Sequence, residues 1–249
     1  MTPKKPSPST TWKTLNLLED WLTTGFSREH SQLAASDPAP ARAESAPIEP
    51  HASSTDQDRA AELAAVAAEL AAVAAEVSAC MKCGLAVNRT TTVPGEGALN
   101  PLVLFVGEGP GADEDRTGRP FVGAAGQYLD TWLPAIGLKR EQCFIANCVK
   151  CRPPQNREPH PDERVACLHF LERQIEALHP RVVCCLGRIA AQTLLGTTAS
   201  VSELRGRMHQ HRGIPVVVTY HPSAVLRDKA ALRKPVWEDL KLLKSMLGT

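Results

Sequence analysis

The sequence predicts an α/β domain built on a parallel sheet that helices cover on both faces. Two observations lead to this fold class. Four short runs rich in Val, Ile and Cys have the length and composition of buried strands, and segments that we interpret as helices separate them. Strands that alternate with helices in this way form a parallel sheet, whose binding sites lie at the carboxyl ends of the strands. The predicted strands span residues 102–107, 143–149, 182–187 and 214–220, and the predicted helices span 124–137, 161–179 and 188–196.

Size and composition set the outer bounds. The 249 residues suffice for one catalytic domain and a tail, and the net charge of +1 leaves nucleic-acid binding to local clusters of basic residues. No apolar run reaches the ~18–20 residues of a membrane helix, so we expect no membrane partner. The first residues lack the apolar core and the cleavage site of a secretory signal. Eight cysteines without such a signal indicate a reducing cytoplasm, where they act as metal ligands or buried thiols.

Residues 1–56 have the composition of a disordered tail, because a stretch dominated by Pro, Ser and Ala buries too little apolar area to offset its chain entropy. Within the tail, the apolar residues of segment 12–26 can share one face of a helix. Two interpretations stay open for this segment. It is either a short helix that packs on the domain or a tethered helix that binds a protein partner.

Residues 57–79 contain the repeat ELAAVAA-ELAAVAA-EV, rich in alanine, the best helix former. The apolar residues recur at alternating spacings of three and four, which is a heptad pattern. The segment is shorter than the roughly three to four heptads that indicate a coiled coil. It therefore predicts a single helix that packs on its own chain and leads into Cys80, the first residue of a catalytic domain spanning 80–249.

Four cysteines form a pattern typical of a metal site. Cys80 and Cys83 make a CxxC, and Cys151 and Cys167 follow later in the chain. Four thiolates suit zinc or an iron–sulfur cluster, and the spacing alone does not choose between them. The other four cysteines lie in predicted strands, where cysteine is often a small buried hydrophobe. They are Cys143, Cys148, Cys184 and Cys185; Cys148 forms a second CxxC with Cys151, but we expect the strand to end between the two.

The segment GEGPGADED, residues 107–115, follows the first predicted strand. Its three glycines suggest a phosphate-binding loop, but its four carboxylates would repel phosphate and the GxGxxG spacing is absent. A loop whose backbone approaches a ligand closely, with a carboxylate beside it, suits a neutral ring better. The alternative is an acidic turn that only faces solvent.

Two side chains suit the recognition of a flat base. Phe121 lies in the glycine-containing segment RPFVG and could stack on a base, or else be an ordinary core residue. Asn147 ends a strand that is otherwise apolar, and its amide offers one donor and one acceptor group. This pair matches the O4 and N3–H edge of uracil and mismatches the amino group of cytosine. The alternative is an amide that the backbone satisfies.

The motif HPSAVLR, residues 221–227, follows the last predicted strand. His221 there can donate a hydrogen bond to an oxygen that gains negative charge. Ser223 and the amides around it suit phosphate contacts, and Arg227 suits contacts with a phosphate or a groove of DNA. A lone histidine at a strand end is often structural. The acidic segment at the same sheet edge favours the functional role.

The motifs GEGPGADED, TGRPFVG, NCVKCRPP and HPSAVLR resemble those of the family-4 uracil-DNA glycosylases, the iron–sulfur type, over residues 78–245. The resemblance implies a three-layer α/β/α sandwich with a four-stranded parallel sheet. It also implies a structural 4Fe–4S cluster held by Cys80, Cys83, Cys151 and Cys167. Cys148 is not among the matching positions.

The resemblance implies the uracil pocket as well. Uracil would contact the backbone of Glu108 and Gly109 and would stack on the ring of Phe121. The amide of Asn147 would bind its edge, and the imidazole of His221 would bind its O2. Glu114 would stabilise the developing sugar cation or orient the attacking water. Gly109 lies where some sister families carry Asp or Asn, so no side chain activates water there.

By resemblance, the chain is a monofunctional DNA glycosylase and a monomer. It would flip uracil out of single- or double-stranded DNA and leave an abasic site for base excision repair, in the cytoplasm at the bacterial nucleoid. The short segment between Cys151 and Cys167 lacks the basic insertion of a related branch that traps its product covalently. Three alternatives stay open: a noncatalytic iron–sulfur DNA-binding module, a zinc-stapled nucleotide-binding protein, and a glycosylase that also removes hypoxanthine or xanthine.

Overall fold

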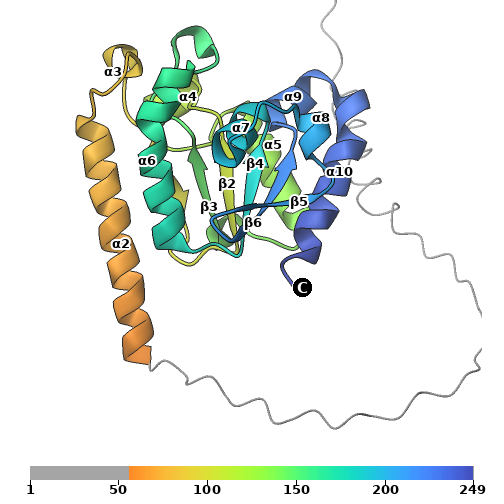
Figure 1. The fold of residues 1–249 in the computed structure, drawn as a ribbon, viewed down its shortest axis with the longest axis horizontal. Helices are drawn as coiled ribbons and strands as arrows, with labels where there is room; N and C mark the ends of the chain where they lie inside the picture. Colours follow the sequence, from red (N-terminus) through yellow and green to blue (C-terminus); the bar gives the residue numbers. More distant parts are fainter. Residues whose placement is uncertain (1–55, 249) are drawn as a thin grey trace, which may run out of the picture. The chain divides into compact units, whose positions relative to one another are not determined.

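The computed structural model describes residues 56–248, so the predictions for the tail lie outside the described residues (Figure 1). The centre is a six-stranded sheet with the order β1-β3-β2-β4-β6-β5. Four neighbouring strands are parallel, and the two edge strands are antiparallel to their neighbours. The parallel strands are β2 (Val103–Gly107), β3 (Cys143–Asn147), β4 (Val182–Leu186) and β6 (Ile214–Thr219); the edge strands are β1 (Glu96–Gly97) and β5 (Met208–His211).

The predicted α/β fold is confirmed, with two more strands than the four expected. Each of the four parallel strands lies within a predicted run, but β3 stops at Asn147, two residues before the expected end. The edge strands escaped prediction because β1 has only two residues and β5 reads MHQH, with alternate residues exposed. Neither carries the apolar run by which a buried strand is recognised.

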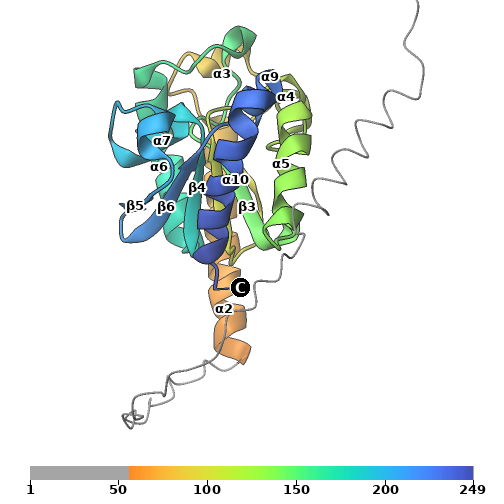
Figure 2. The same ribbon diagram turned by 90° about the vertical axis from the view of Figure 1, so that its right-hand side faces the viewer.

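Helices form one layer on each face of the sheet (Figures 1 and 2). One layer contains α5 (Ala124–Ala135), α9 (Pro222–Arg227) and α10 (Lys229–Ser245). The other contains α6 (Pro161–Leu178), α7 (Arg188–Leu195) and α8 (Val201–Leu204). Short helices occupy the connections: α3 (Leu85–Asn88), α4 (Ala112–Thr117), and the 3-10 turns η1 (Arg140–Gln142) and η2 (Pro154–Asn156).

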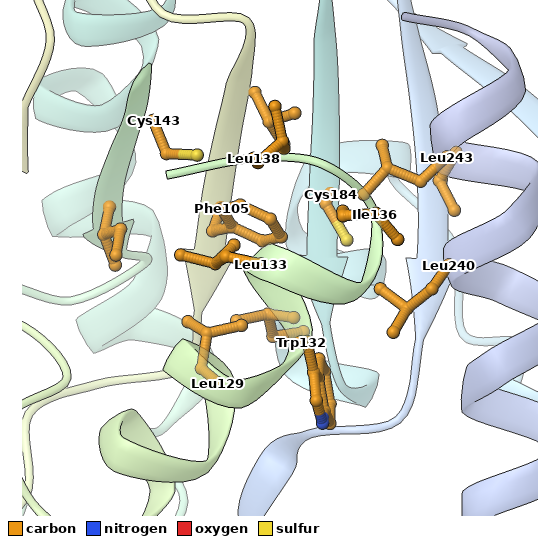
Figure 3. Close-up of a cluster of buried hydrophobic side chains, with 14 of the residues drawn as sticks. Phe105, Leu129, Trp132, Leu133, Ile136, Leu138, Cys143, Cys184, Leu240 and Leu243 are labelled. Carbon is orange, nitrogen blue, oxygen red and sulfur yellow. The ribbon is translucent and has the colours of Figure 1, made fainter. Parts of the chain in front are cut away.

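The two cores follow from the alternation of side chains along the strands. Figure 3 shows Phe105 of β2 next to Leu133 of α5, with Leu240 and Leu243 of α10 in the same cluster. The neighbouring residue Leu104 points to the opposite face and packs with α6 and α7. All residues of β2, β3 and β4 are buried, as expected for parallel strands covered on both sides.

Helix α2 (Asp56–Ala79) lies outside α6, as Figure 1 shows. Val73 and Val77 of α2 are buried in a cluster with Phe170 of α6. Arg173 of α6 forms ion pairs of 2.7 Å with Glu69 and with Glu76 on α2. The heptad pattern therefore serves the docking of one helix on its own chain. Among the described residues, no helix combines the length and the apolar character needed to cross a membrane.

Candidate functional site

A cavity of about 560 Å³ opens at the carboxyl ends of the parallel strands. The helices α4, α7 and α9, which follow β2, β4 and β6, begin at this edge (Figure 1). Eight residues that the sequence singled out as catalytic, uracil-binding or DNA-binding line this one cavity. They are Glu108, Gly109, Glu114, Phe121, Asn147, His221, Ser223 and Arg227.

The end of β2 forms a floor on which an amide and an aromatic ring meet. A Cβ at Gly107 would lie 2.4 Å from Oδ1 of Asn147 and 2.6 Å from the ring of Phe121. The backbone of Phe121 has a φ of +52°, rare for a residue with a side chain, and a Cβ at Gly126 would lie 1.8 Å from its carbonyl oxygen. Two glycines thus allow this close approach. Phe121 is both a core residue and a wall of the cavity.

Glu114 fastens two segments of the cavity wall to each other. Its Oε2 accepts a hydrogen bond from the backbone N–H of Gly111 at 3.1 Å. Its Oε1 accepts from the N–H groups of Val122 (2.9 Å) and Gly123 (2.8 Å), next to Phe121. The carboxylate is buried, and three of its roughly four acceptor positions are therefore used within the protein.

The acidic segment is not merely a solvated turn. From Ala112 it forms the helix α4, which the sequence analysis took for a loop. Asp115 is buried as well, and its Oδ1 accepts from the N–H of Thr90 at 2.9 Å. Gly109 packs so closely that a Cβ there would lie 2.8 Å from Val149. A longer side chain at this position would have to displace that valine.

Asn147 presents an unsatisfied acceptor to the cavity. The residue is 1% exposed, and its Oδ1 has no hydrogen-bond partner among the described residues. Buried polar atoms nearly always have a partner, and leaving one without costs about 1–3 kcal/mol. The amide is therefore not a strand-end group that the backbone satisfies. Asn147 lines the cavity, where a ligand can supply the missing N–H.

His221 is held as a neutral imidazole. Its Nδ1 accepts a hydrogen bond from the backbone N–H of Ser223 at 3.1 Å and lies 2.8 Å from the hydroxyl oxygen of that residue. Because Nδ1 accepts, the proton of the neutral ring is on Nε2. Burial, and secondly the charge of Arg227, lowers the pKa of His221 to about 4. The ring is thus a fixed hydrogen-bond donor whose partner must lie in the cavity.

The hydroxyl and the amide of Ser223, a residue predicted to contact phosphate, both hold His221 in place. Glycine again makes room, because a Cβ at Gly187, which has a φ of +92°, would lie 2.9 Å from the Cβ of His221. The ring of Phe121 lies 5.6 Å from the imidazole, between ring centres. Imidazole, phenyl ring and amide therefore form a continuous surface.

Charged side chains surround the mouth of the cavity. Arg227 is exposed, and Arg188 and Arg157 also line the cavity. Arg188 forms an ion pair with Glu158. Burial raises the pKa of Glu108, and the negative charge of Glu158 raises it further. The sequence analysis missed Arg157 and Arg188. Arg188 could have been found, since it comes directly after the strand 182–187 at the same sheet edge.

The four cysteines proposed as ligands line one cavity of their own. Cys80 follows α2, Cys83 precedes α3, Cys151 follows β3 by four residues, and Cys167 lies on α6. Two N–H groups donate to sulfur there: Arg89 Nη1 to Cys151 Sγ at 3.2 Å, and the backbone of Lys150 to Cys167 Sγ at 3.4 Å.

This donor set suits an iron–sulfur cluster, because thiolates with N–H···S hydrogen bonds are what such clusters take. None of the four sulfurs is in a disulfide. Within residues 56–248, no group of three or more His, Cys, Asp or Glu is arranged to hold a single metal ion.

The other four cysteines are fully buried in the two sheet cores. Burial raises the pKa of Cys143 and of Cys148 to about 12, and it also raises the pKa values of Cys184 and Cys185. Such thiols remain protonated. Cys148 packs against α6 and α7 in the sheet core, whereas Cys151 packs with Cys167 in a separate cluster under α2.

Residues 94–241 match the family model described as the Uracil DNA glycosylase superfamily. The chain is 46% identical over 171 residues to the Type-4 uracil-DNA glycosylase of Thermotoga maritima, covering 68% of this chain and 89% of the relative. It is 42% identical over 177 residues to the Type-4 uracil-DNA glycosylase of Archaeoglobus fulgidus, with 68% and 88% covered. A Type-5 uracil-DNA glycosylase of Pyrobaculum aerophilum is 36% identical over 150 residues, with 53% and 65% covered.

Proposed function

Since the chain belongs to the uracil-DNA glycosylase superfamily and to its type-4 family, we propose that it hydrolyses the N-glycosidic bond of deoxyuridine in DNA and leaves an abasic site. The observation that carries this proposal is the buried, unpartnered Oδ1 of Asn147 at the floor of the cavity. Uracil offers an N–H at N3 for that oxygen and an acceptor at O4 for the amide nitrogen. Cytosine offers an acceptor and a donor in these two places, so the same amide rejects it.

The base reaches the cavity only after it has left the DNA stack. Flipping a nucleotide out costs a few kcal/mol, less where the base is mismatched or already single-stranded. Phe121 provides a face for the flipped ring, and the guanidinium of Arg227 at the mouth suits a backbone phosphate. We therefore propose uracil in single- or double-stranded DNA as the substrate.

His221 acts on the leaving group. As the glycosidic bond lengthens, negative charge gathers on O2 of uracil, and the Nε2–H of the neutral imidazole donates a hydrogen bond to it. A neutral imidazole can perform this task because its Nε2–H stabilises the anion as a hydrogen-bond donor, without transfer of the proton. Ser223 keeps the ring in the required tautomer through its bonds to Nδ1.

The sugar becomes positively charged as the base leaves, and Glu114 is the carboxylate that lines the same cavity. Its three backbone hydrogen bonds fix the position of the negative charge and of the segment that carries Phe121. We assign it to electrostatic stabilisation of the sugar cation. Gly109 brings no side chain to the cavity, so water attacks without an activating group at that position.

The cysteines Cys80, Cys83, Cys151 and Cys167 would hold a 4Fe–4S cluster. The cluster would tie the end of α2, the segment after β3 and the start of α6 into one unit. No step of base removal passes through it. The support is the shared sulfur lining with its two N–H···S bonds.

An alkaline cleavage assay tests the proposal. The purified protein is incubated with an end-labelled oligonucleotide that carries one U·G pair and is then treated with hot alkali, alongside the same oligonucleotide with C·G. Alkali-dependent scission at uracil alone, lost in His221→Ala, is the expected result. Absence of scission from a folded protein that binds the oligonucleotide would contradict a glycosylase and favour a noncatalytic DNA-binding module.

A further inference from the structure

The guanidinium of Arg89 connects two parts of the cysteine cavity that are far apart in the chain. Its Nη1 donates to the carbonyl oxygen of Cys80 at 2.9 Å and to Sγ of Cys151 at 3.2 Å. Its Nη2 donates to the carbonyl oxygen of Ser78 at 2.8 Å. The sequence analysis gave this residue no role, and the proposed base-removal chemistry does not use it.

Each of these contacts suits a positive donor. The carbonyls of Ser78 and Cys80 lie at the C-terminal end of α2, where free carbonyl groups carry partial negative charge. Cys151 is buried beside them and, as a cluster ligand, its sulfur would be a thiolate. A planar guanidinium offers several N–H groups in a fixed fork, so it can serve the helix end and the sulfur at once.

The contact bears on the electron-accepting property of a cluster. N–H···S hydrogen bonds and a nearby positive charge favour the more negative, reduced state, and so they raise the reduction potential. The contact also bears on retention, because α2 delivers Cys80 while β3 delivers Cys151. A group that bonds to both segments keeps these two ligands at their spacing.

We infer that Arg89 is the positioning residue of the proposed iron–sulfur cluster: it holds the end of α2 to the ligand Cys151 and raises the reduction potential of the cluster. This inference rests on the cluster assigned above. It is independent of whether the protein releases uracil, because none of its contacts reaches the uracil cavity.

The test compares Arg89→Gln and Arg89→Lys with a matched control, Arg173→Gln. Arg173 also ties α2 to the body of the domain, through Glu69 and Glu76, but no hydrogen bond or ion pair of this side chain involves sulfur. The full-length proteins are purified and reconstituted without oxygen. The readouts are iron content, the rate at which visible absorbance is lost to a chelator, and the midpoint potential followed by electron paramagnetic resonance.

Arg89→Gln should lose its cluster at least about tenfold faster than the unmodified protein, in line with the 10–100-fold cost of removing an outer-shell partner of a metal site. Its midpoint potential should become more negative. Arg89→Lys keeps the charge but cannot span all three acceptors. Its midpoint potential should therefore lie close to that of the unmodified protein, whereas its cluster should still be lost faster. Arg173→Gln should leave the potential unchanged.

Two results would overturn the inference. One is an unchanged potential and retention in Arg89→Gln; the other is an equal change in Arg173→Gln, which would reduce the effect to the docking of α2. If the unmodified protein holds no iron after reconstitution, the inference falls together with the cluster. The alkaline cleavage assay would then still decide the proposed glycosylase activity on its own.

Discussion

Replacing His221 with alanine should lower the single-turnover rate of uracil release by about 10²–10³, the usual cost of removing one donor to a developing oxyanion. The expected loss of rate is that of one hydrogen bond, because the ring supplies a single N–H donor to the cavity. Its Nδ1 is occupied by Ser223, so only Nε2–H is free for O2 of uracil. Backbone groups and Asn147 remain in the variant, and the residual rate should exceed that without protein.

The pH dependence gives an independent check on the same residue. The pKa of His221 is about 4 in the folded protein, against an ordinary value near 6.5. The neutral ring therefore persists down to about pH 4, and its loss should not limit the rate between pH 5 and 8. Arg227→Ala removes the second cause of the shift and should move the acid limb to higher pH.

The sign for stability follows from the same pKa shift. Between pH 6.5 and about 4 the unfolded chain binds a proton at this histidine and the folded chain does not, so the free energy of unfolding falls as the pH falls. His221→Gln removes that proton linkage, and its unfolding free energy should depend less on pH in this window.

The measurement is a rapid-quench single-turnover assay on a U·G oligonucleotide, with DNA binding checked by anisotropy. A loss smaller than fivefold in His221→Ala with normal binding would refute the donor role. So would an acid limb near pH 6.5 in the unmodified protein, since it would show an ordinary, solvated imidazole.

Four further variants test the floor of the cavity and the cluster. Gly107→Ala places a Cβ 2.4 Å from Oδ1 of Asn147 and should lower kcat/KM by about 10² or more through misplacement, with the visible absorbance retained; a near-normal value would show that the floor is not tightly built. Asn147→Asp leaves an acceptor facing O4 of uracil and should lower kcat/KM about 5–150-fold, for a cost of about 1–3 kcal/mol, while discrimination against cytosine shrinks. Unchanged discrimination would remove the edge-reading role. Cys151→Ser should abolish the visible absorbance and Cys148→Ser should preserve it, and the reverse pattern would show that the ligand set is misassigned.

The parallel sheet could be predicted because a strand buried on both faces consists of a continuous run of apolar residues. Helix α10 was not predicted: its first turns, KAALRKPVWEDL, mix charges with a proline, and only contact with the sheet shows that Leu240 and Leu243 form the apolar face. Helix α4 was missed for a related reason. Its acidic residues resemble a solvated turn until the backbone partners of Glu114 and Asp115 are known.

The sequence could predict which residues line the candidate site but not the hydrogen bonds between them. The rule that sites lie at strand carboxyl ends brought Asn147 and His221 to one cavity from sequence alone. The sequence spacing does not encode side-chain orientations. It therefore could not show that Ser223 holds the imidazole or that Glu114 accepts hydrogen bonds from the amides beside Phe121. Glycine at 107 is explained only by the ring and the amide that crowd against it in space.

The stretch that follows β3 explains why one short segment serves both sites. Within five residues it carries Asn147 at the uracil cavity, Cys148 in the sheet core and Cys151 in the cysteine cavity. Backbone hydrogen bonds continue after the strand ends: the N–H of Cys148 donates to the carbonyl of Gly107, and the N–H of Val149 donates to that of Glu108. A displacement at Cys151 is therefore transmitted through a bonded backbone to the amide that reads the base. This connection gives a physical reason why the proposed cluster, although it takes no part in the proposed chemistry, would support the base-binding site.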